Sequence, residues 1–131
     1  MRLVGMMLLI VLATGCSEDE MVKLESGVYS GSFTAMYDVD KSPLIHDVSI
    51  TIDGNRFTCS SGPQYIPAGG SGTFQVEGNE ITFVDENVWT ANFDWGLILN
   101  GTYLIRENNG EYLIQCVIND VVRYEYQVKK E

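Results

Sequence analysis

Hydrophobic and polar residues alternate with a period of two along most of the chain after Glu20. The stretch IHDVSITID, residues 45–53, places His46, Val48, Ile50 and Ile52 on one side and polar residues on the other. The stretch VVRYEYQVKK, residues 121–130, alternates in the same way. No segment after Glu20 keeps apolar residues at helical spacing for long, so the pattern predicts strands with one face toward water.

Eight stretches of this kind predict eight strands. They cover residues 27–38, 45–53, 55–60, 71–77, 80–85, 97–107, 111–119 and 121–129. The connections DGN, EGNE, NNGE and ND contain Gly or Asn, which accept the positive φ of tight hairpin turns. Consecutive hairpins form an antiparallel meander, and closure of the sheet removes its two unpaired edges. We therefore expect an all-β fold, an eight-stranded antiparallel up-and-down barrel over residues 26–131.

The first residues of the chain have a different pattern. Arg2 is followed by an apolar run, by two small residues and then by Cys16. This arrangement is typical of a secretory signal, and the run is too short to span a hydrocarbon core of about 30 Å as a helix. Cysteine directly after glycine resembles the lipobox of bacterial lipoproteins. The resemblance implies a signal peptide over residues 1–15 and a lipid on Cys16; the alternative is an ordinary signal peptide followed by an unmodified cysteine.

Three acidic residues, Glu18, Asp19 and Glu20, follow Cys16. Such a run cannot pack in a core, so residues 16–25 are expected to form a solvated tether. The run also resembles the export signal that sends lipoproteins of Bacteroidetes to the outer face of the outer membrane. This resemblance implies an exported outer-membrane lipoprotein, exposed at the cell surface and held at the membrane by acyl chains on Cys16.

The charge of the chain narrows the possible partners. Cleavage before Cys16 removes Arg2 and changes the formal charge from −10 to −11. Such a chain is repelled by phosphate backbones, which argues against nucleic-acid binding. An exported chain could join Cys59 to Cys116, but both lie within alternating patterns, and two small buried thiols are the favoured interpretation.

A glycine followed two residues later by an aromatic residue recurs along the chain. The pairs are Gly27/Tyr29, Gly72/Phe74, Gly101/Tyr103 and Gly110/Tyr112. Together with the stretch from SGTFQVEGNE to NGTYLI, they resemble the small lipocalin-like, or calycin-like, barrel lipoproteins of Bacteroidetes. The opening GVYSGSF is similar to a degenerate lipocalin first-strand motif, Gly-x-Trp, with Tyr29 in place of Trp. The resemblance covers Gly27 to Lys129 and implies the barrel, with no particular ligand.

Candidate catalytic groups are few. His46 is the only histidine, so neither a Ser/His/Asp triad nor a multi-histidine metal site can be assembled. It is expected at the barrel rim, as a hydrogen-bonded residue or as a ligand contact. Asp85, Glu86 and Asp94 could supply a glycosidase pair, but acids at strand ends commonly cap turns. We therefore expect a protein that is not an enzyme and that has no metal site and no cofactor.

Two segments are candidates for closing one end of the barrel. The segment NVWTANFDWG, residues 87–96, carries Trp89, Phe93 and Trp95. Trp89 and Phe93 are four residues apart, so a helical turn would place these two on one face. In SGPQYIPAGGSG, residues 61–72, Tyr65 and Ile66 are apolar residues between prolines and glycines. Each segment is either a packed plug or surface loop, or the mouth and lid of a pocket.

The predicted interior is crowded with aromatic rings. The residues expected to point inward are Tyr29, Phe33, Phe57, Phe74, Phe83, Tyr103, Tyr112, Tyr124 and Tyr126. An eight-stranded barrel is either filled by its side chains or holds one small ligand.

Two functions follow from these alternatives. In the first, the barrel binds a small apolar or amphipathic ligand, in contact with the two candidate segments, His46, Tyr103 and Tyr124. In the second, the barrel is solid, and its surface, including Ile98 and Leu104 on the outer face of a strand, contacts another protein of the cell envelope.

Overall fold

The computed structural model describes residues 22–90 and 92–131. The predicted signal peptide, Cys16 and the acidic run lie outside the described residues. Among the residues that are described, no helix is long and apolar enough to cross a membrane.

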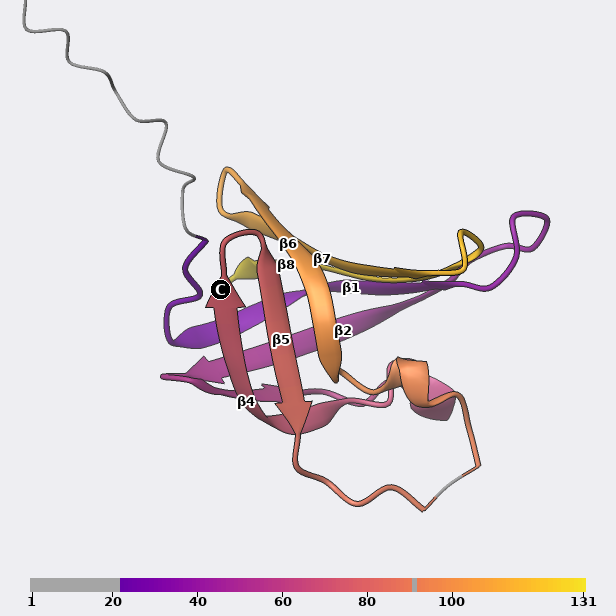
Figure 1. Ribbon diagram of the computed structural model, residues 1–131, viewed down its shortest axis with the longest axis horizontal. Helices are drawn as coiled ribbons and strands as arrows, with labels where there is room; N and C mark the ends of the chain where they lie inside the picture. Colours follow the sequence, from indigo (N-terminus) through magenta and orange to yellow (C-terminus); the bar gives the residue numbers. More distant parts are fainter. Residues whose placement is uncertain (1–21, 91) are drawn as a thin grey trace, which may run out of the picture.

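The described chain folds into a closed antiparallel barrel whose neighbouring strands follow sequence order (Figure 1). Its strands are β1 (Gly27–Met36), β2 (Leu44–Asp53), β3 (Arg56–Cys59), β4 (Gly70–Glu77), β5 (Glu80–Asp85), β6 (Gly101–Asn108), β7 (Glu111–Ile118) and β8 (Val122–Lys130). Two 3-10 turns complete it, η1 (Pro63–Tyr65) and η2 (Trp95–Leu97). The predicted fold class is confirmed.

The predicted strand bounds differ clearly from the structure in one place. The strand predicted over residues 97–107 begins only at Gly101, because Trp95–Leu97 form η2 and the next residues pack as a loop. Ile98, predicted on the outer face, is buried, whereas Leu104 is partly exposed on the outside of β6 as predicted. The apolar run before Gly101 therefore belongs to a packed loop and not to a strand.

Closure of the barrel depends on the pairing of β1 with β8. The register runs from Tyr29 opposite Lys130 to Met36 opposite Arg123. At Gly31 the two backbones approach so closely that a Cβ atom would lie 1.8 Å from the carbonyl oxygen of Gln127. Only glycine fits this position, so the closure of the sheet depends on one residue without a side chain.

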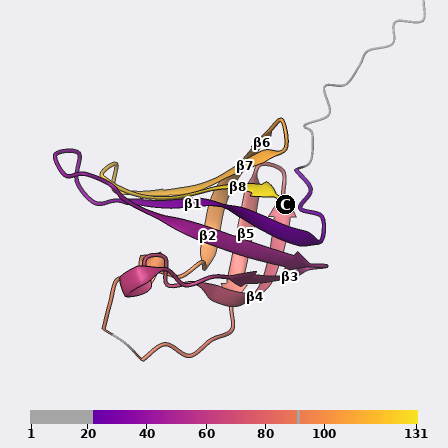
Figure 2. The same cartoon turned by 180° about the vertical axis from the view of Figure 1, so that it is seen from behind.

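The two ends of the barrel are built differently (Figures 1 and 2). We call one the hairpin end: it holds the tight turns at Gly54, Gly78 and Gly110, all with positive φ. Both described chain termini also lie there, where the Glu131 N–H donates to the Val28 carbonyl at 2.8 Å. We call the other the loop end: it holds the connections 37–43, 60–69, 86–100 and 119–121.

Four strands extend farther toward the loop end than the others. Pairing of β1 with β2 continues to Ala35 opposite Leu44, and pairing of β7 with β8 to Ile118 opposite Val122. Pairing of β2 with β3, in contrast, begins only at Ile50, and pairing of β6 with β7 stops at Gln115. We call this four-stranded extension the arm: residues 44–48 of β2, 32–36 of β1, 122–126 of β8 and 116–118 of β7. Its tip carries the β1–β2 loop and the β7–β8 turn in both views (Figures 1 and 2).

Aromatic rings fill the interior of the barrel. Of the predicted inward rings, Tyr29, Phe33, Phe57, Phe83, Tyr103, Tyr124 and Tyr126 are at most 4% exposed, and Phe74 and Tyr112 pack against this core while partly exposed. Ring contacts run from Phe57 through Phe83, Tyr103 and Tyr126 to Phe33, with centroids 4.7–6.2 Å apart. They connect β3 with β1 through the lumen, so side chains occupy the space where a lipocalin-like ligand would lie.

The sequence leaves open whether the two cysteines form a disulfide, and in the structure both are free thiols. Cys59 is buried and Cys116 is half-buried. Burial raises the pKa of the Cys59 thiol to about 12, as expected for an inert core residue. The interpretation as small apolar side chains is therefore the one that the structure supports.

Candidate functional site

Two loops close part of the barrel at the loop end. The chain around Ala68 runs parallel to the chain around Ile98: the Ala68 N–H donates to the Leu97 carbonyl at 2.9 Å, and the Leu99 N–H to the Gly69 carbonyl at 2.8 Å. Ala68, Leu97 and Leu99 are buried. The loops at residues 60–69 and 95–100 thus form a packed plug.

The aromatic rings of three predicted site residues contact one another next to this plug. Tyr65 stacks on Phe93 with ring centroids 5.3 Å apart and an interplanar angle of 15°, and Phe93 meets Trp89 edge to face at 5.8 Å. The predicted helical turn is wrong, because the described residues on either side of position 91 are not helical and the 3-10 turn begins at Trp95. The loop that carries Trp89 and Phe93 brings the rings together without helical structure in its described residues. We call Trp89, Phe93 and Tyr65 the ring stack.

Asp85, at the end of β5, holds the ring stack in place. Its carboxylate accepts hydrogen bonds from the Trp89 indole N–H at 2.6 Å, from the Asn87 side-chain amide at 2.6 Å and from the Ser71 backbone N–H at 3.0 Å. Glu86, the next candidate acid in the chain, forms an ion pair with Arg56 at 2.7 Å. Asp85 therefore orders a loop, as acids at strand ends commonly do.

Asp94 connects the same loop to the arm. Its carboxylate accepts hydrogen bonds from the Tyr37 hydroxyl at 2.8 Å, from the Tyr124 hydroxyl and from the Gly96 backbone N–H at 2.9 Å. We call Tyr37, Asp94 and Tyr124 the clasp. Tyr37 comes from the β1–β2 loop and Tyr124 from β8, so the clasp ties three separate parts of the chain together.

The clasp changes the titration of its members. Partial burial raises the pKa of Asp94, but the hydrogen bonds from Tyr124, Tyr37 and Gly96 outweigh it, so that the net pKa lies below the ordinary value. Burial and the neighbouring carboxylate raise the pKa of Tyr37 to about 12, and the same causes raise the pKa of Tyr124 strongly. The clasp is therefore a carboxylate bound by two neutral phenols at neutral pH.

The remaining predicted residues do not form one site. Tyr103 lies in the lumen, where its hydroxyl is 3.5 Å from the Ile98 carbonyl oxygen. Ile66 packs against the core, and His46 is half-buried on the arm. Trp95 is 59% exposed on η2. The structure brings the ring stack and the clasp together around one loop. Tyr37 was missed because it falls inside the strand predicted over residues 27–38, whereas β1 ends at Met36.

Exposed apolar side chains gather at the loop end. They are Val39, Leu44, Ile45, Tyr65, Val88, Trp95, Val117, Ile118 and Val121. Val39 is 76% and Val88 is 90% exposed, the two highest exposures in this group. Two further exposed apolar residues, Val84 and Leu104, lie on the outer faces of β5 and β6. The hairpin end carries none of the large apolar residues exposed among the described ones.

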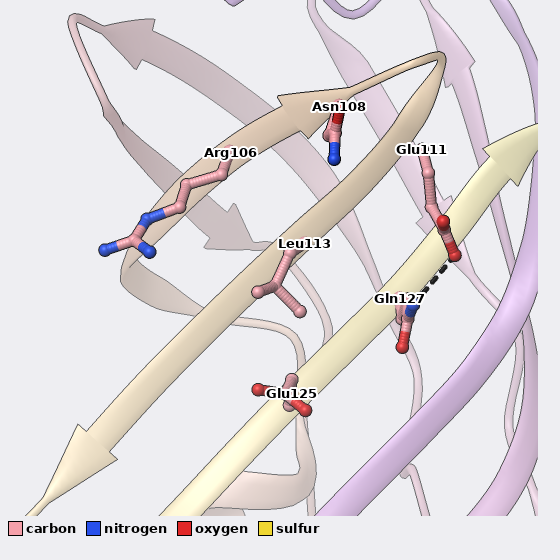
Figure 3. A pocket seen from close by; sticks show the side chains of 6 residues that line it. All are labelled: Arg106, Asn108, Glu111, Leu113, Glu125 and Gln127. Atoms are coloured by element: carbon pink, nitrogen blue, oxygen red, sulfur yellow. Dashed lines mark hydrogen bonds between the residues drawn. The ribbon is translucent and has the colours of Figure 1, made fainter.

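Hollows on the outer wall of the barrel have linings of mixed polar and apolar residues. One of about 380 Å³ lies over β6, β7 and β8 (Figure 3). Its lining residues are Arg106, Asn108, Glu111, Leu113, Glu125 and Gln127. The Gln127 amide donates to the Glu111 carboxylate at 2.8 Å, whereas the guanidinium of Arg106 points away from both acids (Figure 3). Among the described residues, no group of three or more His, Cys, Asp or Glu side chains is placed to hold a metal ion.

One polar group in the lumen lacks a partner. The hydroxyl of Tyr126 is fully buried and makes no hydrogen bond within the described part of the chain. Burial raises the pKa of Tyr126 well above its ordinary value. Tyr126 is thus the opposite of Tyr124, two residues earlier on β8, whose hydroxyl is bound in the clasp.

Comparison of the chain with protein-family models, with curated proteins and with solved structures found no match.

Proposed function

We propose that this protein is a non-enzymatic, lipid-tethered barrel of the bacterial outer membrane that binds another envelope protein through its loop end. The observation that carries the proposal is the distribution of exposed apolar side chains, which gather at the loop end and are absent from the hairpin end within residues 22–90 and 92–131. Apolar surface that is exposed at one end of a solid domain is typical of a protein-interaction site.

The placement of the chain termini agrees with this function. Val22 and Leu24 pack against the core near the hairpin end, and Lys130 there lies 3.4 Å from Glu25 in an ion pair. A lipid on Cys16 would therefore attach the barrel to the membrane by its hairpin end. The loop end would then face away from the membrane, toward a partner at the cell surface.

The filled lumen favours a protein partner over a ligand held inside the barrel. The rings that connect Phe57 with Phe33 pack at contact distances across the interior. A ligand of the lipocalin kind would have to displace these rings, each of which contributes a large buried apolar area to stability. The outer surface is the part of the molecule that remains available.

Photo-crosslinking tests the proposal. A photoreactive amino acid is placed at Val39 or Val121, at the loop end, and at Asn55 in a turn of the hairpin end as the matched exposed control. We expect one discrete protein adduct from cells carrying the probe at either loop-end position and none from Asn55. Equal labelling at Asn55, or labelling only by lipid, contradicts the proposal.

A small apolar or amphipathic ligand at the loop end is the second candidate, and the ring stack is the observation that favours it. Tyr65 is 50% exposed although its ring stacks on Phe93, so one aromatic face remains for a further ring or an acyl chain. A stoichiometric small molecule released on denaturation of the natively purified protein would support this function. It would bind on the plug rather than in the lumen.

A further inference from the structure

We infer that the partner adds an extended strand to the free edge of β2 in the arm, pairing antiparallel with residues 44–48, and that this strand is basic where it meets Asp47. The inference rests on the proposed function, since it names the way in which the loop end holds its partner. Addition of a strand to an exposed sheet edge is a recurrent mode of protein recognition.

The edge arises where β3 leaves β2. The last contacts between them are at Ser49, whose carbonyl accepts from the Ser60 N–H at 2.8 Å and whose N–H donates to the Ser60 hydroxyl at 2.9 Å. Both backbone groups of Ser49 therefore point away from β1. Along an antiparallel strand, the backbone groups of successive residues point alternately to one neighbouring strand and to the other. The N–H and C=O groups of Ile45 and Asp47 therefore point to the same side as those of Ser49.

These four backbone groups are not used by the described residues. The pairing of β2 with β3 covers only Ile50 to Asp53, and no hydrogen bond of the described chain involves the outward groups of Ile45 or Asp47. A row of unpaired groups beside an ordered strand is a template for another strand. A hollow of about 410 Å³ opens at the start of this row. Its lining residues are Ser30, Gly31, Asp47, Val48, Ser49 and Ser60.

The side chains along the edge specify the partner. Ile45, which is 59% exposed, and Asp47 lie on the outer face of β2, with Leu44 and His46 on the inner face. Cross-strand neighbours interact most favourably when apolar faces apolar and opposite charges meet. The formal charge of −10 repels an acidic partner. The geometry therefore selects a strand with a basic residue opposite Asp47 and, two residues later, an apolar residue opposite Ile45.

A second copy of this chain fits the edge less well. If two copies paired through this edge by two-fold symmetry, Ile45 of each copy would lie opposite Asp47 of the other, an apolar residue facing a charge. The pairing would also bring two strongly acidic molecules together. The edge of β7 in the arm is a weaker site, because it spans only residues 116–118 and offers the outward backbone groups of Val117 alone.

Peptide binding tests the inference. The probe is the acetylated, amidated peptide Ser-Thr-Lys-Thr-Val-Thr-Ser, and the control peptide has Glu in place of Lys. With the ¹⁵N-labelled protein, we expect saturable binding of the Lys peptide that slows hydrogen exchange of the Ile45 and Asp47 amides and leaves the amide of Ile50 unchanged. The Glu peptide should bind about tenfold more weakly, which corresponds to one favourable cross-strand charge pair becoming unfavourable.

Two variants make the test specific to the edge. Asp47→Pro removes one outward N–H that β1 does not use, so the barrel should still fold while the Lys peptide binds about tenfold more weakly. Asp47→Lys should reverse the preference between the two peptides. This second variant keeps the test decisive if Asp47→Pro unfolds.

The outcomes separate the inference from the proposed function. Absence of peptide binding, binding without protection of Ile45 and Asp47, or an unchanged preference in Asp47→Lys overturns the inference. A concentration-dependent dimer that Asp47→Pro dissociates also overturns it, in favour of a second copy. Photo-crosslinks at Val39 and Val121 that persist in Asp47→Pro would leave the proposed function standing while the edge mechanism fails.

Discussion

The hairpin end and the loop end are made from the same eight strands by different means. At the hairpin end, tight turns with glycine or asparagine at positive φ connect neighbouring strands. At the loop end, the clasp joins Tyr37 to Asp94 across 57 residues, and Asp94 to Tyr124 across 30. The first end is determined by local turn chemistry. At the second, only the β7–β8 turn, with Asn119 and Asp120 at positive φ, is local among the described connections, and contacts between distant residues order the rest.

The largest difference between the ends should appear in their aromatic residues. Phe57 is 2% exposed and packs on Phe83 at 4.9 Å, so Phe57→Ala should lower the free energy of unfolding by about 3–5 kcal/mol. Phe93→Ala, in the ring stack, should cost only about 1 kcal/mol, because that side chain is partly exposed and loses mainly its ring contacts. Denaturant unfolding of both variants measures the difference. Equal losses of unfolding free energy would show that Phe93 in the ring stack contributes as much to the core as Phe57 in the lumen.

Two tyrosines on β8 give a smaller and more specific contrast. Tyr124→Phe removes a hydrogen bond to the Asp94 carboxylate and should destabilise the protein by about 1.5 kcal/mol. Tyr126→Phe removes a buried hydroxyl without a partner and should be neutral or stabilising by about 1 kcal/mol. Thermal unfolding of the two variants at pH 7 provides the comparison. A destabilised Tyr126→Phe would indicate a bound water or ligand at that hydroxyl.

The smallest expected effect is the pH dependence of the clasp. The pKa of Asp94 is lower in the folded chain than in the unfolded chain, so its ionised form stabilises the fold at pH values above the unfolded pKa of about 3.9. This contribution is lost as the pH falls through the lowered pKa. We therefore expect the stability difference between the protein and Asp94→Asn to be constant from pH 7 to 5 and to shrink below pH 4. A difference that stays constant down to pH 2 would contradict the role of the carboxylate.

The hairpin end could be predicted from the sequence better than the loop end. The turns at Gly54, Gly78 and Gly110 could be predicted because the residue that accepts positive φ stands in the turn itself. Trp89 and Phe93 were predicted to lie together but on the wrong backbone, because their spacing fits a helical turn and also a loop held by Asp85. The stacking of Tyr65 on Phe93 was not predicted. Residues 97–100 were assigned to a strand because a short apolar run such as Leu97, Ile98 and Leu99 fits the start of a strand and a packed loop equally well.

The clasp could not be predicted from the sequence. Asp94 was considered only with its near neighbours in the chain, whereas its partners come from the β1–β2 loop and from β8. The free edge of β2 was hidden for a similar reason. It depends on β3 having only four residues, and β3 ends because the chain turns into the plug at Ser60 rather than because of any residue in β2.

The pairing of β1 on both sides has a mechanical consequence. β1 is hydrogen-bonded to β2 from Gly27 to Ala35 and to β8 from Tyr29 to Met36. A pulling force applied between the hairpin end and the loop end would run along these strands. It would load the hydrogen bonds on both sides of β1 together in shear, whereas a force across the strands would break them one after another. In the proposed function, with an anchor at one end and a partner at the other, the barrel would act as a stiff link that resists extension.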